Sequence, residues 1–284
     1  MLLNLIFSFS VLFATILCAV TVGFAGLGAK LLWLVFFAGG WVVSLLLCFL
    51  AVWIPAGHVD PQKEQDGDDP YIRAIVKLYA PAVFKLLGCK IETSGTEKLP
   101  KNGRFLLVCN HLYDLDPGIP LTVFPRAQLA FISKKENLQK PIVGPLMLKI
   151  QCQLIDREND RAALKTILKC ISILKEDKAS IAVFPEGRIV KDGYLLHDFR
   201  PGVFKIAQKA NVPIVVCTMR NTNHVIGRLL KGKGSTVDIR LLEVIPAAQL
   251  QGCTTVEISD RVYNLMAADL GAENILTPEE EENA

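Results

Sequence analysis

Two long apolar stretches at the N-terminus constrain this chain more than any other feature. Residues 2–25 and 31–54 are almost entirely apolar, and Lys30 is the only fixed side-chain charge before residue 60. Each stretch would form a helix of roughly 36 Å, enough to cross about 30 Å of hydrocarbon. A signal peptide fits poorly, because no basic segment precedes the first stretch and a second stretch follows it. We therefore expect an N-terminal transmembrane helical hairpin within residues 1–55, with a single cleaved or re-entrant segment as the alternative.

Charge is concentrated in the rest of the chain. The 284 residues are 51% hydrophobic and 21% charged, and about 225 of them follow the apolar stretches, enough for one α/β domain. The net charge of +3 and the absence of a long basic run argue against a nucleic-acid partner. Eight scattered cysteines lack metal-ligand spacing, so we expect neither a disulfide framework nor a metal site.

Residues 56–88 connect the apolar stretches to this domain. The segment 59–69, VDPQKEQDGDD, has the composition of a solvated linker. Residues 71–88 then show helical periodicity, with Arg73, Lys77 and Lys85 inside an arc of about 120°. Two interpretations stay open: a surface helix of the domain, or an amphipathic interfacial helix with its basic residues at the lipid headgroups. These basic residues also favour a cytoplasmic location for this side of the membrane.

Predicted strands and helices alternate from residue 89 onward. The strands are short, apolar or β-branched, and bounded by turn residues, and they cover residues 90–93, 105–109, 129–132, 180–184, 214–218 and 237–245. Helical patterns cover residues 160–176, 202–210 and 254–270, the first with Asn159 or Asp160 as its N-cap. The alternation predicts an α/β sandwich with a largely parallel sheet. We expect this domain to span residues 89–276, before an acidic, disordered tail at 277–284.

The strand at 105–109 ends in NHLYDLDPG, which places one histidine and two aspartates within six residues. On a continuous helix His111 and Asp116 would point about 140° apart, so they can meet only across a turn. Pro117 and Gly118 favour a turn, with Asp116 as the N-cap of the next helix. Asp116 would then hold the Nδ1 proton of His111 and leave Nε2 to deprotonate a hydroxyl. Geometry equally permits Asp114, and an incidental histidine beside a capping aspartate is the plain alternative.

Three other segments place notable residues at the ends of apolar strands. FPEGR, residues 184–188, contains Gly187, which lets backbone N–H groups approach a ligand closely, and Arg188, whose planar fork suits a phosphate. LIDR, residues 154–157, again places an arginine, Arg157, just past an apolar strand. VPIVV, residues 212–216, by itself indicates only a buried strand.

In this order, the segments NHLYDLD, LIDR, FPEGR and VPIVV resemble the four sequence blocks of the glycerolipid acyltransferases, the family of bacterial 1-acyl-glycerol-3-phosphate acyltransferases and their relatives. The resemblance spans about residues 70–250, and its His-x4-Asp and Phe-Pro-Glu-Gly blocks together are specific. It implies a glycerol-3-phosphate-acyltransferase-like α/β sandwich. It also implies an O-acyltransferase that moves a fatty acyl group from an acyl thioester to the sn-2 hydroxyl of 1-acyl-glycerol 3-phosphate, giving phosphatidic acid.

The resemblance also implies roles for individual residues. His111 corresponds to the family's catalytic base and Asp116 to its charge partner. The resemblance implies a role in substrate binding for Asn110, Arg157, Glu186, Gly187 and Arg188. It implies the same for Lys134 and Lys135, because the segment ISKKEN is similar to a segment of the family. The third block of the family usually has a threonine between its glycine and arginine, whereas here Arg188 directly follows Gly187.

The partners and the alternatives follow from the same resemblance. We expect acyl-coenzyme A or acyl carrier protein as co-substrate, no other cofactor, and lysophosphatidic acid as the membrane lipid partner. The expected location is multi-pass in the bacterial cytoplasmic membrane, with the catalytic domain on the cytoplasmic face. The missing threonine leaves glycerol 3-phosphate or another lysolipid open as acceptor. Two other classes of function are a hydrolase with Cys109 as nucleophile and a non-catalytic membrane lipid-binding protein.

Overall fold

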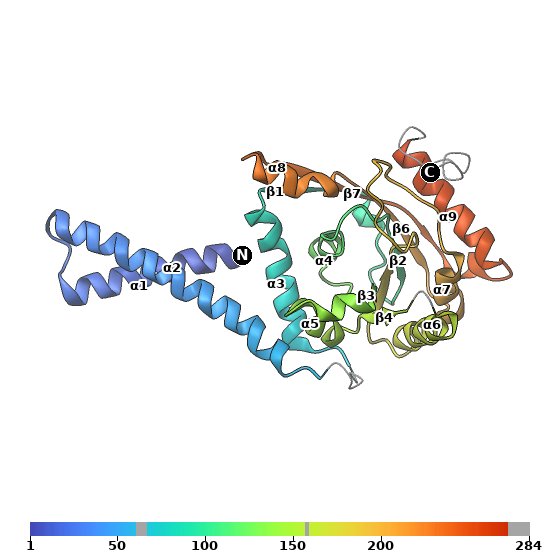
Figure 1. The fold of residues 1–284 in the computed structure, drawn as a ribbon, viewed down its shortest axis with the longest axis horizontal. Coiled ribbons are helices and arrows are strands. Elements are labelled where there is room, and N and C mark those ends of the chain that lie inside the picture. Colours follow the sequence, from blue (N-terminus) through green and yellow to red (C-terminus); the bar gives the residue numbers. More distant parts are fainter. Residues whose placement is uncertain (61–66, 157–158, 272–284) are drawn as a thin grey trace.

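The computed structural model describes residues 1–60, 67–156 and 159–271, in which an arm of two long helices adjoins an α/β domain (Figure 1). The strands of this described part form a seven-stranded sheet: β1 Cys89–Ser94, β2 Leu106–Val108, β3 Leu129–Lys134, β4 Gln153–Ile155, β5 Ser180–Val183, β6 Ile214–Arg220 and β7 Ser235–Ile245. Their order is β1-β7-β6-β2-β5-β3-β4, and only β6 and β7 pair antiparallel. The predicted mixed α/β fold with a largely parallel sheet is therefore confirmed.

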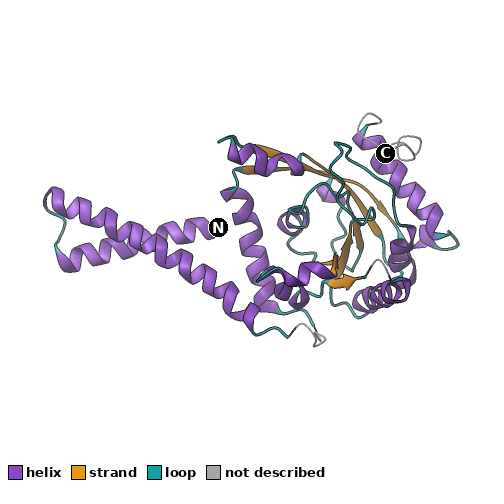
Figure 2. Ribbon diagram, viewed as in Figure 1, coloured by secondary structure: helices purple, strands orange, loops and turns teal. Residues whose placement is uncertain are grey.

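Helices lie on either side of these strands (Figure 2). The α-helices are α1 Leu2–Thr21, α2 Gly26–Gly57, α3 Pro70–Leu86, α4 Gly118–Val123, α5 Val143–Lys149, α6 Asp160–Lys175, α7 Lys205–Ala210, α8 Val225–Leu230 and α9 Thr255–Leu270. Short 3₁₀ helices occupy Thr96–Lys98, Lys135–Gln139, Pro201–Phe204, Thr222–His224 and Ala247–Leu250. Sequence periodicity did not predict α5 or α8 as elements, because segments of six or seven residues are too short to show a period. The apolar strand expected just before Arg157 corresponds to β4.

Side chains of the central strands alternate between two hydrophobic clusters, one on each face of the sheet. On β2, Leu106 and Val108 pack with residues of α6, α7 and α9. Leu107 lies between them in sequence and packs on the other face, with residues of α3, α4, α5 and α8. This period of two is the normal consequence of the pleat. Burial on both faces explains why the strand reads as a continuous apolar run.

The topology decides where a site can form. Strands β2 to β6 are mutually parallel, so their carboxyl ends meet at one edge of the sheet. His111 follows β2 and Glu186 follows β5, and these two strands are neighbours. Ligands of open α/β sheets bind at this edge. The fold therefore brings together segments that are about 75 residues apart in sequence.

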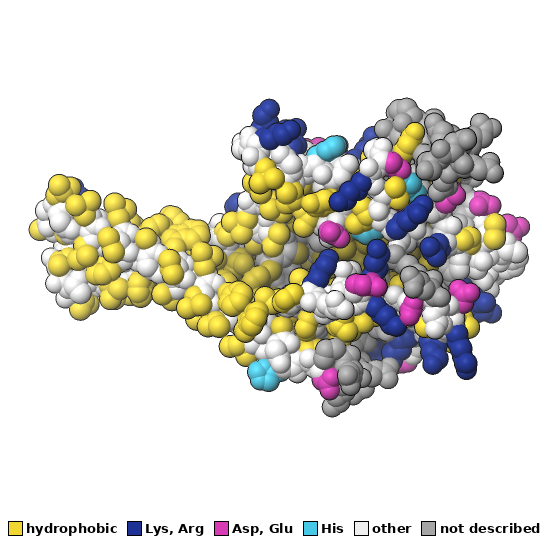
Figure 3. Space-filling view, viewed as in Figure 1, with side chains coloured by type: hydrophobic (Ala, Val, Ile, Leu, Met, Phe, Trp, Pro, Cys, Tyr) yellow, Lys and Arg dark blue, Asp and Glu magenta, His cyan; other side chains and the backbone are white. Residues whose placement is uncertain are grey.

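The arm is formed by α1 and α2, which cross and pack against each other (Figure 1). Small and polar side chains face the contact: a Cβ added at Gly40 would lie 3.0 Å from Ser10 Cα, and Trp33 Nε1 donates to Thr15 Oγ1 at 3.2 Å. Large apolar side chains cover the outer surface (Figure 3). Both helices are long and apolar enough to cross a membrane. Outward-facing apolar side chains around a contact of small residues favour membrane association of the arm.

Helix α3 lies between the arm and the domain. Asp69 caps its N-terminus by accepting hydrogen bonds from Tyr71 N and Ile72 N. The hydroxyl of Tyr71 also donates to the carbonyl of Ala51 on α2, at 3.0 Å. Ile72 and Phe84 are buried in the domain core. This helix therefore packs on the domain and is also hydrogen-bonded to the arm.

The basic face expected on this helix is only partly present. Lys77 and Lys85 are exposed, but Arg73 is 4% exposed and forms an ion pair with Asp68 at 2.6 Å. Arg73 also donates to the backbone carbonyls of Leu129 and Ile150. The prediction of Arg73 at a basic surface was wrong, because helical spacing does not distinguish a solvated arginine from a buried, paired one.

Candidate active site

The turn after β2 brings His111 and Asp116 together. His111 Nδ1 lies 2.8 Å from Asp116 Oδ2, which also accepts hydrogen bonds from Leu112 N at 2.6 Å and Tyr113 N at 2.8 Å. The Asp116 side chain is fully buried, whereas that of His111 is 16% exposed. A carboxylate on Nδ1 fixes the tautomer and leaves Nε2 available to a substrate. Of the two candidate aspartates, Asp116 is therefore the partner, and Asp114 is exposed.

Asp116 does not cap the next helix, so that part of the prediction was wrong. Helix α4 begins at Gly118, and Pro117 occupies its N-cap position. The Asp116 carboxylate turns back instead, toward the histidine ring and the N–H groups of the turn that precedes it. The local spacing fits both arrangements, because a carboxylate accepts from whichever donors the turn brings nearest.

Glu186 supports the same turn from the neighbouring strand β5. Its Oε1 accepts a hydrogen bond from the backbone N–H of His111 at 3.1 Å. Its Oε2 lies 3.6 Å from Nδ1 of the buried His197, whose Nε2 lies 2.9 Å from Asp192 Oδ2. The Glu186 side chain is fully buried. Glu186 therefore holds the backbone of His111 in place from within the protein interior. This position does not fit the expectation of direct substrate binding.

The charges behind His111 are coupled. The pKa of His197 is raised to about 8, mainly by its interaction with Glu186 and further by Asp192. Burial raises the pKa of Glu186, while its interactions with His197 and with the N–H of His111 favour the carboxylate. A protonated His197 therefore supplies the positive charge that a buried carboxylate requires. His197 was not predicted as a site residue, since it lies in no motif.

Asn110 has a structural position. Its amide nitrogen donates to the carbonyls of Leu195 and Met219, both at 2.9 Å, and its oxygen accepts from Met219 N at 2.7 Å. The residue is 0% exposed. Asn110 thus ties the end of β2 to β6 and to the loop after β5. Its hydrogen-bonding groups serve the fold, and its expected contact with substrate stays a prediction.

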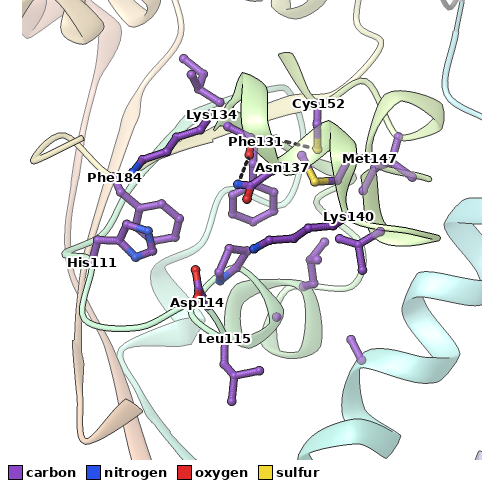
Figure 4. Close-up of a pocket in the computed structure, with 18 of the residues that line it drawn as sticks. His111, Asp114, Leu115, Phe131, Lys134, Asn137, Lys140, Met147, Cys152 and Phe184 are labelled. Atoms are coloured by element: carbon purple, nitrogen blue, oxygen red, sulfur yellow. Dashed lines mark hydrogen bonds between the residues drawn. The ribbon is translucent and has the colours of Figure 1, made fainter. Parts of the chain in front are cut away.

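A cavity of about 540 Å³ opens beside His111 (Figure 4). Its polar lining residues are His111, Asp114, Ser133, Lys134, Asn137, Lys140 and Arg188. Its apolar lining comes largely from α3 and α5, including Val76, Val83, Leu146 and Met147. Both of these helices contact α2 of the arm. The cavity therefore combines several cationic side chains with an apolar wall on the side of the arm.

The predicted basic residues fall into different positions around this cavity. Lys134 and Arg188 line it, and Gly187 also lines it, at a φ of +75°. Lys135 instead pairs with Asp156 at 2.9 Å and is not among the lining residues. The predicted Arg157 lies outside the described residues, so its role stays a prediction.

Lys140 is a residue that sequence reasoning missed. Figure 4 shows Lys134 and Lys140 extending toward the space beside His111 and Asp114. Lys140 follows the 3₁₀ helix Lys135–Gln139, so the turn brings it back toward the cavity. The only sequence signal was its closeness to the lysines at 134 and 135.

Cys109 does not have the environment of a nucleophile. It is 1% exposed, and its thiol pKa is raised well above the usual value by a hydrogen bond with Cys217 and by burial. A reactive cysteine needs an accessible thiolate. The structure therefore speaks against a hydrolase that uses Cys109.

Comparison with known proteins gives a family match that includes the residues described above. Residues 90–220 match the family model described as Acyltransferase, a segment that includes His111, Asp116 and Glu186. This segment is therefore similar to that family.

Several curated relatives of this chain are named as 1-acyl-sn-glycerol-3-phosphate acyltransferases. A 1-acyl-sn-glycerol-3-phosphate acyltransferase of Borreliella burgdorferi is 28% identical over 166 residues, 58% of this chain and 65% of the relative. The protein of that name from Saccharomyces cerevisiae is 27% identical over 192 residues, 66% of this chain and 62% of the relative. A probable one from Mycoplasma pneumoniae is 35% identical over 136 residues, 46% of this chain and 50% of the relative. In each case the match spans less than two thirds of the relative's length.

One solved structure is similar in fold. The 1-acyl-sn-glycerophosphate acyltransferase PlsC of Thermotoga maritima superposes with a TM-score of 0.59 at 23% sequence identity. The superposition covers 70% of this chain and 78% of that protein. The α/β domain therefore has a fold similar to that of PlsC.

Proposed function

We propose that this protein is an O-acyltransferase that moves a fatty acyl group from an acyl thioester to the sn-2 hydroxyl of 1-acyl-glycerol 3-phosphate, giving phosphatidic acid. The single observation that carries the proposal is the His111–Asp116 pair at the edge of a cavity that is cationic at one part and apolar at another. The shared name of the curated relatives supports the choice of acceptor.

His111 is the general base of this mechanism. Asp116 holds Nδ1, so Nε2 takes the proton of the acceptor hydroxyl as its oxygen bonds to the thioester carbonyl carbon. The buried carboxylate of Asp116 stabilises the imidazolium that forms. The carbon–sulfur bond then breaks, and the proton on Nε2 passes to the departing thiolate. The transfer needs no protein nucleophile.

The cationic part of the cavity suits the acceptor's phosphate. Lys134, Lys140 and Arg188 line this part, and a phosphate dianion is bound well by such groups. Arg157 stays a predicted fourth contributor. The acyl chain fits the apolar wall formed by α3 and α5, which contact the arm.

The location follows from the arm. We infer that α1 and α2 cross the bacterial cytoplasmic membrane as a hairpin and that the α/β sandwich domain lies on the cytoplasmic face. The outward-facing apolar side chains of the arm and the exposed Lys77 and Lys85 after the second helix support this orientation. A lysolipid would then reach the apolar wall of the cavity from the bilayer.

The test is transfer by the full chain, purified in detergent or in lipid vesicles. A labelled fatty acyl thioester is offered with 1-acyl-glycerol 3-phosphate, glycerol 3-phosphate or 1-acyl-glycerophosphocholine as acceptor. We expect label in phosphatidic acid and none in the other two products. Transfer chiefly to another acceptor would replace the proposed substrate, as the missing threonine before Arg188 allows. No transfer to any acceptor, together with stoichiometric lysolipid binding, would instead favour a non-catalytic lipid-binding protein.

A further inference from the structure

A second cavity of about 360 Å³ lies next to the first, toward the opposite side of the sheet. Its walls are formed by the end of β4, the first half of α6, the loop after β5, and the segment from Arg200 to Lys205. Helices α6 and α7 lie on the side of the domain away from the arm (Figure 1). This volume falls within the roughly 300–1,000 Å³ of typical small-molecule sites. None of the roles discussed above uses it.

The two cavities share lining residues next to the proposed base. Both are lined by Ile132, Phe184 and Gly187. The Phe184 ring stacks on His111, with 4.2 Å between ring centroids. Gly187 has a φ of +75°, a backbone conformation that glycine adopts easily. Because it has no side chain, it leaves space where it lines the two cavities. A molecule that spans both cavities would therefore have its middle next to His111.

The second cavity combines apolar walls with two cations. Leu164, Ile167 and Val203 line it, and so do Arg200 and Lys205, which are both exposed. Within residues 1–60, 67–156 and 159–271, neither Arg200 nor Lys205 forms an ion pair. The backbone N–H of Arg200 donates to Pro185 O at 2.9 Å, which fixes this segment to the loop after β5.

We propose that the second cavity holds the phosphopantetheine arm of the thioester donor, with its phosphate at Arg200 and Lys205. The inference rests on the proposed acyltransferase function. The thioester then lies between the cavities beside His111, and the donor's fatty chain extends into the apolar part of the first cavity. The apolar walls suit the methyl groups of the arm, and the Asp160 carboxylate, which also lines the cavity, can accept from an amide N–H.

The placement of the cavities favours this assignment over the reverse one. The first cavity is walled by the helices that contact the arm, so a membrane lipid reaches it directly. The second is walled by α6 and the segment from Arg200 to Lys205, on the side away from the arm, where a water-soluble carrier can approach. Coenzyme A and acyl carrier protein present the same phosphopantetheine group, so one site serves either donor.

The test rests on two donors that differ by one phosphate, acyl-4′-phosphopantetheine and acyl-pantetheine, together with the two natural carriers. KM is measured at saturating lysolipid for four donors: acyl-coenzyme A, acylated acyl carrier protein, acyl-4′-phosphopantetheine and acyl-pantetheine. The wild-type full chain is compared with its double variant Arg200→Gln, Lys205→Gln. We expect KM to rise about tenfold for the phosphate-bearing donors, as for loss of charge-assisted contacts, and to stay within about twofold for acyl-pantetheine. KM for the lysolipid should not change. Lys209→Gln, on the exposed side of α7 and outside both cavities, is the matched control and should behave as wild type.

A binding measurement separates this inference from the proposed function. Calorimetric titration with 4′-phosphopantetheine itself requires no acyl transfer, and the double variant should lose the affinity that wild type and Lys209→Gln retain. The inference is overturned if the variant binds 4′-phosphopantetheine as wild type does, if wild type does not bind it, or if the variant instead raises KM for the lysolipid. Wild type that binds 4′-phosphopantetheine but transfers no acyl group would contradict the proposed function alone.

Discussion

Two buried carboxylates flank one histidine, and they hold different parts of it. Asp116, from the turn after β2, accepts from the His111 ring at Nδ1. Glu186, from the loop after β5, accepts from the backbone N–H of the same residue. Both side chains are fully buried. One carboxylate therefore sets the tautomer and charge of the ring, and the other sets the position of the chain that carries it.

The two carboxylates also differ in how their charge is balanced. All three donors to Asp116 come from the same turn, residues 111–113. The partners of Glu186 come from outside its own turn. His111 follows β2, and His197 lies further along the loop that carries Glu186 and is itself paired with Asp192. The charge of Asp116 is balanced within the turn that carries the base, whereas that of Glu186 depends on a histidine of the loop after β5. The comparison predicts that substitutions lose activity in the order His111, Asp116, Glu186, His197.

The largest effect is expected for His111→Ala. Loss of the base should lower kcat by roughly 1,000-fold or more, the upper part of the range for general acid–base catalysis. The thermal midpoint should change little, because the ring lies at the cavity edge and is partly exposed. His224→Ala, at an exposed histidine outside the cavity, serves as control. Comparable activity of the two variants would exclude His111 as the base.

Asp116→Asn tests the ring partner against its neighbour. An amide of the same shape removes the charge that stabilises the imidazolium, and kcat should fall roughly 100-fold or more. Asp114→Asn changes an exposed carboxylate in the same turn and should stay within about threefold of wild type. Single-turnover rates of both variants, measured above and below neutral pH, check this. A larger loss in Asp114→Asn than in Asp116→Asn would reverse the assignment.

Glu186→Gln tests positioning against phosphate binding, the role that the resemblance implies for this residue. The glutamine oxygen can still accept from His111 N, so kcat should fall by only roughly tenfold through a less well-held base. KM for the acceptor should stay unchanged. Lys140→Gln, inside the cavity, is the contrasting variant and should raise KM for the acceptor instead. A rise of acceptor KM in Glu186→Gln would return the residue to the substrate-binding group.

The sequence alone was sufficient where the relevant partners are close in the chain. The strand predicted at residues 105–109 is β2, Leu106–Val108, and it could be predicted within one residue at each end because a buried parallel strand has a distinct composition. The His–Asp pairing could be proposed for the same reason, since five residues separate the partners. The choice between Asp114 and Asp116 came from the family resemblance, and local geometry alone left it open.

Contacts over long sequence distances could not be predicted. Arg73 becomes buried because the carbonyls of Leu129 and Ile150 accept from it, and no helical period encodes such partners. Asn110 was assigned to substrate from its motif, whereas strand β6, more than 100 residues later, uses its side chain. His197 lacked any motif, and only the fold places it behind Glu186. The partners of Arg73 and Asn110 lie far away in the sequence, whereas His197 lies in the same loop as Glu186 and meets it through the path of that loop.

The smallest expected effect concerns His197 and is seen most clearly as a pH dependence of stability. Its pKa is raised to about 8 in the folded chain, against an ordinary value of 6.5. A raised pKa contributes stability that is complete below pH 6.5 and is lost as the pH rises through about 8. The loss is of the order of 1–2 kcal/mol, or a fall of about 3–6 °C in thermal midpoint for a domain of this size.

His197→Gln should remove this dependence. Thermal unfolding of wild type between pH 6 and 9 should show the fall, whereas the variant should have a lower midpoint at pH 6 and a flatter profile above it. Its kcat at pH 7 should drop only a few-fold, because Glu186 still reaches the His111 backbone. His224→Gln, at an exposed histidine, should keep the wild-type profile. An equally steep profile in His197→Gln would mean that Glu186 does not depend on a charged histidine, and the second carboxylate would then be as self-contained as the first.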